Sequence, residues 1–382
     1  MAVSYGFLST HPPTQCGLAT FNSALASHLQ PDLRRSGVVR VTSDADDNLH
    51  HPGVVHTWPA NGVAGWRAAA SALNTFDVAI VQHEYGIYPG EDGEDVLPLL
   101  RRLTGPSIVV LHTVLVQPTM RQKALLEQIV DAASAVVTMT DSARDRLLVG
   151  YVVDGSKVNV IPHGATDHAP VATDRRRRGR PHLLTWGLLG PGKGIEWALR
   201  ALARLQDLDP TPTYTVAGKT HPKVLERHGE AYRTSLRDLG AELDLTDSVR
   251  FESVYRDVAS LSRLIRSADV VVLPYDSREQ VTSGVLIEAV AAGVPVVATP
   301  FPHAVELLGN GPGLLVPYHD AAALAAAIRR LLTEPGLAAQ LARRTRTLAP
   351  ALRWSVVAER YADLAGRLLR SPSKLSAVKA AV

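Results

Sequence analysis

The sequence predicts an α/β protein made of two doubly wound, parallel-sheet halves. Short and almost continuously apolar runs alternate with longer stretches of helical periodicity, as strands covered on both faces require. This pattern stops at residues 164–181 and then starts again. The chain has 382 residues, of which 46% are hydrophobic and 20% charged, so each half can bury a core of its own.

The first half alternates strands with helices. Helices are predicted at residues 18–29, 120–133 and 142–148, the last with Asp141 as its N-cap. Strands are predicted at residues 3–8, 38–42, 78–82, 107–111, 135–139 and 159–161.

The second half repeats the alternation. Strands are predicted at residues 182–186, 213–217, 249–251, 269–274, 295–299 and 313–316. Helices are predicted at residues 195–205, 222–239, 258–268, 284–292 and 321–332. The helix at 284–292 is expected to end at Gly293, since glycine favours helix C-termini.

These elements predict a domain plan. Beyond residue 350 an apolar helical stripe predicts a helix that packs back toward the first domain, followed by a flexible tail. Because open parallel sheets bind ligands at the carboxyl ends of their strands, we expect the site in a cleft between the two domains. The predicted boundaries are 1–165 for the first domain, 166–181 for a linker, 182–350 for the second domain, 351–370 for the helix and 371–382 for the tail.

Charge and cysteine content exclude several classes of protein. The formal net charge is only +3, less than the run of four arginines at 175–178, which we interpret as a solvated linker. A nucleic-acid-binding surface is therefore not expected. The single cysteine, Cys16, cannot form an internal disulfide and favours a reducing compartment. Without a signal-peptide pattern or an apolar run of about 18 residues, we expect a cytoplasmic protein.

A glycine-rich loop at 187–194 follows a strand and precedes a helix. It resembles a P-loop, but Gly194 stands where Ser or Thr would bind Mg²⁺ after Lys193, and the dinucleotide G-x-G-x-x-G spacing is also absent. Amides at a helix N-terminus beside a lysine still favour a phosphate or diphosphate ligand. The alternative is an ordinary turn with an exposed lysine.

The segment 274–297 places a carboxylate on an apolar helix. Glu288 lies one turn into the helix that Gly284 begins. A carboxylate there needs partners, which could be sugar hydroxyls or, in the structural alternative, an arginine. By contrast, the polar pair Asp44 and Asp46 is not expected to bind a metal.

This segment resembles the signature of family 4 glycosyltransferases of the GT-B fold, the group 1 class that includes glycogen synthase and mannosyltransferases. That signature is Glu, seven residues, Glu, then A-x-A-x-G-x-P-V-V, and residues 288–297 read EAVAAGVPVV. Further segments agree in order and spacing over nearly the whole chain: residues 9–25, 160–167, 187–202 and 303–328.

The resemblance implies a retaining hexosyltransferase. It would move mannose or glucose from a nucleoside diphosphate sugar to a glycan, lipid or small-molecule acceptor, without a metal or other cofactor. Lys193 would neutralise the diphosphate, Glu288 would hold the ribose, and His112 would lie beside the donor sugar. The full set implied at the donor is Gly17, Gly192, Lys193, Lys219, Glu279, Gln280, Thr282, Ser283, Gly284, Val285 and Glu288.

The resemblance gives catalytic roles to His112, Lys193 and Gln280. His83 and Glu84 end a strand and are interpreted as acceptor-side residues, with a structural hydrogen bond as the alternative. His163 is expected near the hinge, and Trp58 and Trp66 are interpreted as packing residues.

The sequence departs from the family pattern at several positions. Gln280 replaces the first signature Glu, with Glu279 one residue early, and Ser283 replaces a Gly. Leu188 replaces an Arg of the phosphate loop, a loss that Lys219 could offset.

Several functions therefore stay open. They are a GT-B nucleotide-sugar epimerase or phosphorylase, and a non-catalytic sugar-nucleotide binding protein. A peripheral membrane contact is considered for a lipid acceptor, and the sequence predicts no oligomeric state.

Overall fold

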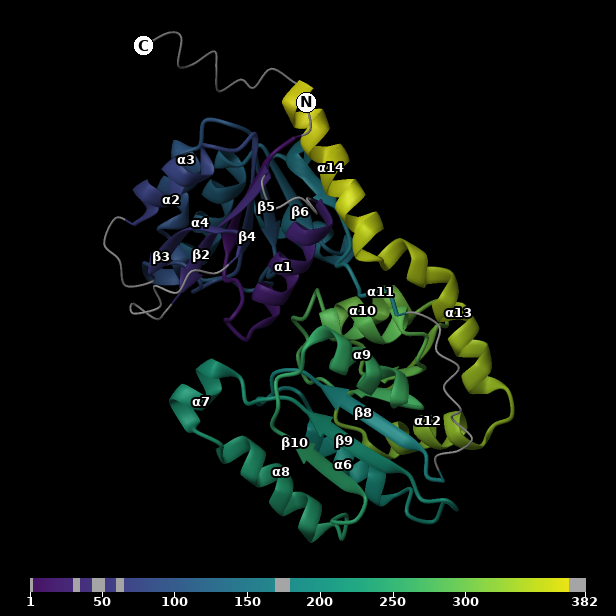
Figure 1. Ribbon diagram of the computed structural model, residues 1–382. Coiled ribbons are helices and arrows are strands. Elements are labelled where there is room, and N and C mark those ends of the chain that lie inside the picture. The colour runs from purple at the N-terminus through teal and green to yellow at the C-terminus, as the bar shows by residue number, and fades with distance from the viewer. Residues whose placement is uncertain (1–2, 30–34, 43–51, 60–64, 169–178, 371–382) are drawn as a thin grey trace, which may run out of the picture. The chain divides into compact units, whose positions relative to one another are not determined.

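The computed structural model describes residues 3–29, 35–42, 52–59, 65–168 and 179–370 (Figure 1). The chain divides into two compact units, one formed by residues 1–164 with 354–382 and the other by residues 165–353. Each unit contains one parallel sheet with helices packed on both faces. The predicted class, two doubly wound α/β domains, is confirmed.

The first unit has a seven-stranded parallel sheet in the order β3-β2-β1-β4-β5-β6-β7. The first two crossovers step outward in one direction, and the chain then returns to build the other side, which gives a doubly wound order that changes direction between β1 and β4. The strands are β1 (Tyr5–Ser9), β2 (Ser36–Thr42), β3 (Val54–Pro59), β4 (Val78–His83), β5 (Ser107–Leu111), β6 (Ala135–Thr138) and β7 (Val158–Val160).

Helices cover both faces of this sheet. Alternate strand residues, such as Phe7 and Ile80, share a core with Phe21 and with apolar residues of the C-terminal helix. That helix, α14, packs along α1, and the Trp354 ring lies 5.0 Å from that of Phe21 (Figure 1). The helices are α1 (Gly17–Leu29), α2 (Trp66–Leu73), η2 (Glu91–Gly93), α3 (Val96–Arg102), α4 (Met120–Ala132), α5 (Asp141–Gly150), η3 (Gly155–Lys157) and α14 (Trp354–Arg370).

The second unit repeats this topology with six strands in the order β10-β9-β8-β11-β12-β13. The strands are β8 (His182–Trp186), β9 (Thr213–Ala217), β10 (Val249–Glu252), β11 (Val270–Leu273), β12 (Val296–Ala298) and β13 (Gly313–Leu315). The helices are α6 (Ile195–Ala203), α7 (Pro222–His228), α8 (Ala231–Glu242), α9 (Val258–Ser267), α10 (Gly284–Ala291), α11 (Pro302–Leu308), α12 (Ala321–Thr333) and α13 (Leu337–Leu352).

Some predicted elements were wrong in detail. The single helix expected at 222–239 is two helices, because Gly229 adopts φ +58° and ends α7. The N-cap of α5 is Thr140, whose Oγ1 accepts from the Ala143 amide at 3.0 Å, whereas Asp141 is the first residue of the helix. The predicted elements also lacked β3, α2, α3, α11 and α13.

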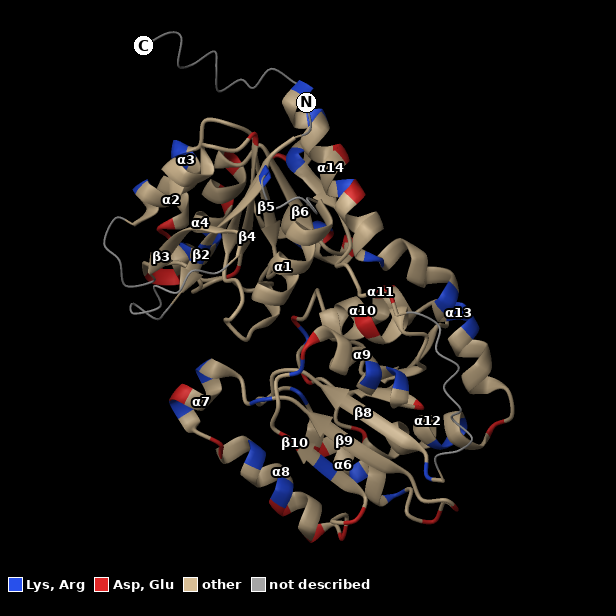
Figure 2. Cartoon of the chain, viewed as in Figure 1, with Lys and Arg blue, Asp and Glu red and all other residues tan. Residues whose placement is uncertain are grey.

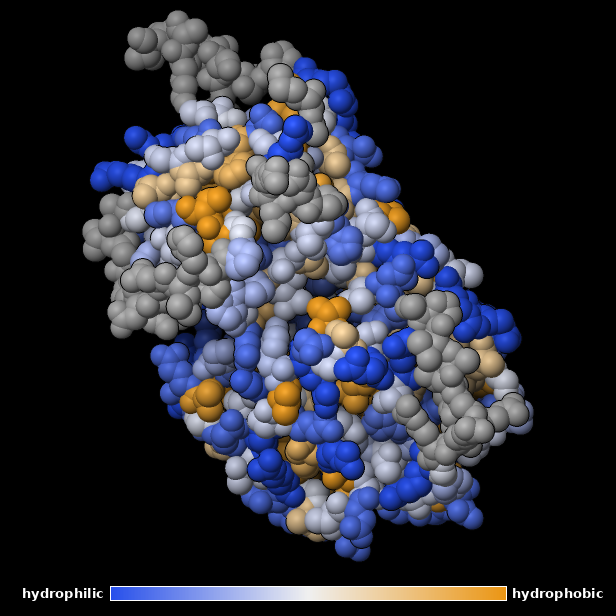
Figure 3. All heavy atoms as spheres, in the orientation of Figure 1, coloured by the Kyte–Doolittle hydropathy of each residue, from blue (hydrophilic) through white to orange (hydrophobic). Residues whose placement is uncertain are grey.

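Charged residues lie on helices and loops, while the strands are largely uncharged (Figure 2). Blue and red residues are mixed in both units, which agrees with the small net charge. On the face drawn in Figure 3, apolar residues form small separate spots among hydrophilic ones. Among the described helices, none combines the length and apolarity that a membrane span needs.

The fold makes a stability prediction at Gly218. This residue has φ +138°, and an added Cβ would lie 1.9 Å from the Gly187 carbonyl oxygen. Gly218→Ala should therefore lower the free energy of unfolding by about 2 kcal/mol or more in urea denaturation. The control is Gly240→Ala within α8, where an added Cβ meets nothing within 4 Å. This substitution should raise the free energy of unfolding by up to about 1 kcal/mol. Equal stability of the two variants would contradict the close approach.

Candidate functional site

The predicted site residues gather at the carboxyl ends of the strands in both units. In each sheet the strand order changes direction at one point, between β1 and β4 or between β8 and β11. Ligands of open α/β sheets bind at such switch points. The loops after these four strands hold Gly17, His83, Lys193 and Gln280 at or beside their ends.

The glycine loop of the second unit is held against the end of β11 by direct backbone contact. Gly194 has φ +61°, and a Cβ there would lie 1.8 Å from the Pro274 carbonyl oxygen. The Asp276 amide donates to the Gly192 carbonyl at 3.0 Å. A side chain at position 194 could not be accommodated, so the loop lies closer to β11 than other residues would allow.

Lys193 lies in this loop as a half-buried cation. Its Nζ is 4.3 Å from the centroid of the Tyr275 ring, a cation–π contact. Burial lowers the pKa of Lys193 below its usual range. Tyr275 is itself 1% exposed and stacks on Phe301, so the ring position is fixed. A partly desolvated ammonium group attracts an anion more strongly than one in bulk water.

The N-terminus of α10 is the second anion-binding element of this unit. Ser283 is the N-cap, and its Oγ accepts from the Leu286 amide at 3.2 Å. The Ser283 amide donates to His303 Nδ1 at 2.8 Å, so it is already used. Of the amides predicted to contact the donor, those of Gly284 and Val285 lack an acceptor within the helix. The sequence reasoning missed His303, although this histidine begins one of the segments that resemble the family.

The other predicted donor residues of the loop have local contacts. Gln280 Nε2 donates to the Thr282 carbonyl at 3.2 Å, so the amide lies against its own loop. Thr282 Oγ1 is buried and has no hydrogen-bond partner in the described part of the chain. Glu279 is exposed. Lys219 is exposed after β9, where its carbonyl accepts from the Leu189 amide at 2.8 Å.

Glu288 has partners that the sequence did not predict. Its Oε1 accepts from the amide and the hydroxyl of Thr166, both at 3.1 Å. Its Oε2 lies 2.8 Å from His168 Nε2, and the His168 side chain is only 2% exposed. Neither the expected sugar contact nor an arginine is needed to explain a carboxylate here.

These contacts join the start of the predicted linker, residues 166–181, to the second unit. Thr166 and His168 are hydrogen-bonded to Glu288 on α10, while residues 169–178 lie outside the described residues, so the linker stays a prediction. The sequence analysis had considered sugar hydroxyls or an arginine as partners of this carboxylate, and nothing in the sequence pointed to Thr166 or His168. The ribose role predicted for Glu288 would have to coexist with these hydrogen bonds.

In the first unit, β4 and β5 end in a cluster of polar side chains. His83 is 1% exposed, and burial lowers its pKa to about 4. Glu84 Oε2 accepts from Thr113 Oγ1 at 2.5 Å, and its Oε1 accepts from the Tyr85 amide at 3.0 Å. Both carboxylate oxygens of Glu84 therefore accept a hydrogen bond from within the protein, as in the structural alternative. His112 lies 2.8 Å from Gln82 through Nε2, a partner that the sequence reasoning missed.

The loop after β1 ends at α1. A Cβ on Gly17 would meet nothing within 4 Å, so the fold itself does not require glycine there. Arg40, which is 2% exposed, donates to Thr14 Oγ1 at 3.3 Å. This buried cation was not predicted, because it stands in a strand that was read only for its apolar residues.

Other interpretations have definite outcomes. Trp58 is fully buried and stacks against Tyr88, which confirms it as a packing residue. His163 Nδ1 lies 2.6 Å from the Gly164 carbonyl, and its ring contacts Phe21. Asp44, Asp46, the arginine run at 175–178 and the tail at 371–382 lie outside the described residues.

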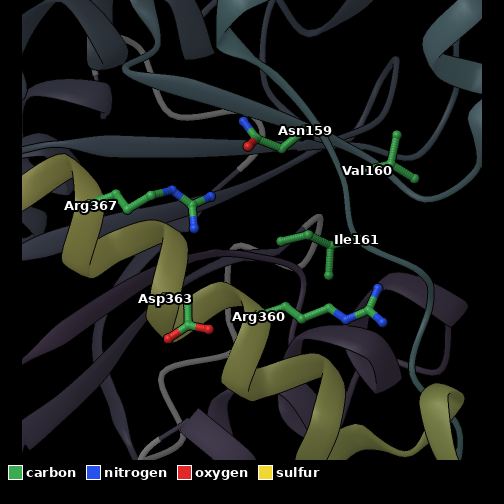
Figure 4. Close-up of a pocket in the computed structure, with 6 residues that line it drawn as sticks. All are labelled: Asn159, Val160, Ile161, Arg360, Asp363 and Arg367. Atoms are coloured by element: carbon green, nitrogen blue, oxygen red, sulfur yellow. The ribbon is translucent and has the colours of Figure 1, made fainter.

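A pocket of about 200 Å³ lies elsewhere in the first unit, between the edge strand β7 and α14 (Figure 4). Its lining residues are Asn159, Val160, Ile161, Arg360, Asp363 and Arg367. None of the predicted site residues lines it. Asp363 lies between the two arginines along the helix, which neutralises part of their charge.

Comparison with known sequences finds proteins similar to the second unit. The family described as Glycosyl transferases group 1 matches residues 180–334. A D-inositol 3-phosphate glycosyltransferase of Kineococcus radiotolerans is 34% identical over 254 residues, covering 61% of this chain and 57% of that protein. A glycogen synthase of Mycobacterium tuberculosis is 30% identical over 240 residues, covering 62% and 55%. The chain thus matches little more than half the length of these curated relatives.

Solved structures agree with the predicted GT-B fold. HepE of Anabaena, in complex with UDP and glucose, superposes with a TM-score of 0.75 at 17% identity and covers 95% of this chain and 100% of that one. Sucrose-phosphate synthase from Thermosynechococcus elongatus gives a TM-score of 0.76 at 22% identity and covers 96% and 99%. At these identities the likeness establishes the fold.

The contacts of Glu288 predict that it stabilises the protein without any nucleotide. Glu288→Ala would leave the buried His168 and the Thr166 amide without their acceptor, at a cost of about 1–3 kcal/mol in the free energy of unfolding. The matched control, Glu279→Ala, removes an exposed carboxylate. Its free energy of unfolding should stay within about 0.5 kcal/mol of that of the parent protein. Denaturation of the ligand-free proteins measures both. If Glu288→Ala were as stable as the control, these hydrogen bonds would not stabilise the fold.

Proposed function

We propose that the chain transfers a hexose from a nucleoside diphosphate sugar to an acceptor hydroxyl, because residues 180–334 match the family described as Glycosyl transferases group 1. The sugar is mannose or glucose, and the acceptor is a glycan, a lipid or a small molecule. We favour UDP as the nucleotide, because HepE, similar in fold, carries UDP in its crystal structures. The proposal includes retention of anomeric configuration and membership of family 4.

One observation carries this proposal. At the switch point of the second sheet, Lys193 is held over Tyr275 on a loop pressed against β11, and the amides that begin α10 follow the same strand. A cation and free helix amides suit a diphosphate, which carries its charge on exposed oxygens. Both groups disfavour a cationic ligand.

In the proposed reaction, the bond from the sugar C1 to the β-phosphate oxygen breaks. The acceptor oxygen bonds to C1 from the same face, and the acceptor proton passes to the departing phosphate oxygen. Negative charge grows on the diphosphate as the bond breaks, so the Lys193 ammonium stabilises the transition state more than the ground state. This assigns charge neutralisation to Lys193 and the amides of Gly284 and Val285, and the proposal needs no metal.

The first unit is proposed to supply the acceptor side. Its polar cluster contains the neutral imidazole of His83 and the carboxylate of Glu84, which hydrogen-bond well to hydroxyl groups. We place the reaction in the cytoplasm, which a single cysteine favours, with a peripheral membrane contact if the acceptor is a lipid.

The function is tested by removing the cation. Lys193→Ala should lower kcat/KM for UDP-glucose, followed as release of UDP, by at least about tenfold, which corresponds to roughly 1.4 kcal/mol. The matched control, Lys223→Ala, removes an exposed lysine near the start of α7 and should stay within about twofold of the parent. GDP-mannose is assayed in parallel. If Lys193→Ala and Lys223→Ala were equally active with both donors, the site assignment would be wrong.

A further inference from the structure

Gln82 and His112 form a side-chain pair across neighbouring strands of the first unit. Gln82 lies on β4, and His112 follows β5 directly. The backbone ladder continues to this point, because the His112 amide donates to the His83 carbonyl at 3.0 Å. The side chains meet through Gln82 Oε1 and His112 Nε2 at 2.8 Å.

The Gln82 side chain lies in a packed core. Gln82 is fully buried, and its main-chain carbonyl oxygen accepts a hydrogen bond from the Tyr88 hydroxyl. Its side-chain Nε2 is buried and has no hydrogen-bond partner among the described residues. Tyr88 is 3% exposed and stacks on the fully buried Trp58, with ring centroids 5.7 Å apart. The amide oxygen is therefore presented to His112 by a packed core rather than by a flexible surface chain.

A neutral imidazole carries a proton on one ring nitrogen and a lone pair on the other. A hydrogen bond that fixes the role of one nitrogen therefore also fixes the role of the other. An amide oxygen only accepts, which requires the proton on His112 Nε2. The lone pair is then on Nδ1. His112 is only half-buried, and within the described residues its Nδ1 is neither buried nor hydrogen-bonded.

The surroundings favour the neutral ring. Phe21 packs edge-on against His112 with centroids 4.9 Å apart. Burial, together with the nearby His163 and His83, lowers the pKa of His112 to about 3. The carboxylate of Glu84 in the same cluster accepts a hydrogen bond from Thr113. At neutral pH, His112 is therefore a poor proton donor and a good hydrogen-bond acceptor.

We propose that Gln82 is a positioning residue that fixes His112 as the Nε2–H tautomer, so that His112 Nδ1 accepts a hydrogen bond from a sugar hydroxyl of the substrate. This substrate role rests on the proposed function. The assignment of the tautomer is independent of that function, because the tautomer is a property of the free protein. His112 then orients a hydroxyl and does not act as a general acid.

The tautomer is measured by ¹⁵N NMR of the full chain labelled at histidine, at pH 7, with His112→Gln used to assign the resonances. The expected wild-type spectrum has a protonated Nε2 and an unprotonated Nδ1 at His112. His28 is an internal reference of the opposite form, since its Nδ1 lies 2.7 Å from the Ala24 carbonyl. A proton on His112 Nδ1, or a mixture of both forms, would overturn the proposal.

Two variants test the cause. Gln82→Met keeps the side-chain length but removes the acceptor, so His112 should become a mixture of tautomers. Gln82→Glu keeps the shape and adds a charge that stabilises the imidazolium, so the His112 pKa should rise by at least about two units. If Gln82→Met fails to fold, the wild-type spectrum and Gln82→Glu still test whether Gln82 controls the His112 ring. A His112 resonance unchanged in both variants would show that Gln82 does not control the ring.

The substrate role has its own readout. Addition of UDP-glucose should shift the Nδ1 resonance of wild-type His112. Gln82→Met should lower kcat/KM about tenfold, and Gln82→Glu should not restore the activity of the parent. The expected tautomer without either effect would refute the substrate role of His112. Loss of activity in Lys193→Ala alongside would show that the proposed function itself still holds.

Discussion

The second unit depends on a close approach of backbone to backbone at the switch point of its sheet. Gly194 meets the Pro274 carbonyl, and Gly218 meets the Gly187 carbonyl, at distances that no side chain permits. These two contacts bring the loops after β8, β9 and β11 together. Lys193 is consequently held over Tyr275 instead of extending into water. Preorganisation of this kind lets a charge act without the cost of reordering solvent and side chain during reaction.

The two units present different chemistry at equivalent edges of their sheets. The second unit combines a half-buried ammonium with helix amides, which suits an anion. The first unit combines His83 and His112, both neutral at pH 7, with the carboxylate of Glu84. Burial of imidazoles keeps them uncharged, so the first unit offers directional hydrogen bonds more than charge. This division matches a diphosphate bound by the second unit and hydroxyl groups bound by the first.

Sequence patterns predicted the fold well because the buried strands are short apolar runs with little competing periodicity. They failed where a local signal was weak or misleading. The break at Gly229 was hidden in a stretch with continuous helical character, and β3 carries a mixed pattern around Trp58. The partners of Glu288 were missed, because Thr166 and His168 look like ordinary polar loop residues and lie far from Glu288 in the sequence.

The site was predictable in outline for a physical reason: βα loops that follow adjacent strands must converge. Spacing alone placed Lys193 and Gly284 correctly at the ends of β8 and β11. Side-chain pairing across strands was not predictable, because Gln82 and His112 are far apart in sequence and meet only through the register of β4 and β5. The same applies to His303, which reaches the Ser283 amide from another helix.

The central claim, that the second unit binds a nucleoside diphosphate sugar, is tested most directly by a thermal-shift panel. UDP, GDP and their glucose and mannose derivatives are compared with free glucose at equal concentration. A nucleotide at about 100 times its dissociation constant should add roughly 2.7 kcal/mol of stability, a readily measured rise in Tm. The account predicts this rise for one nucleotide family and none for free glucose. No shift with any nucleotide would contradict it.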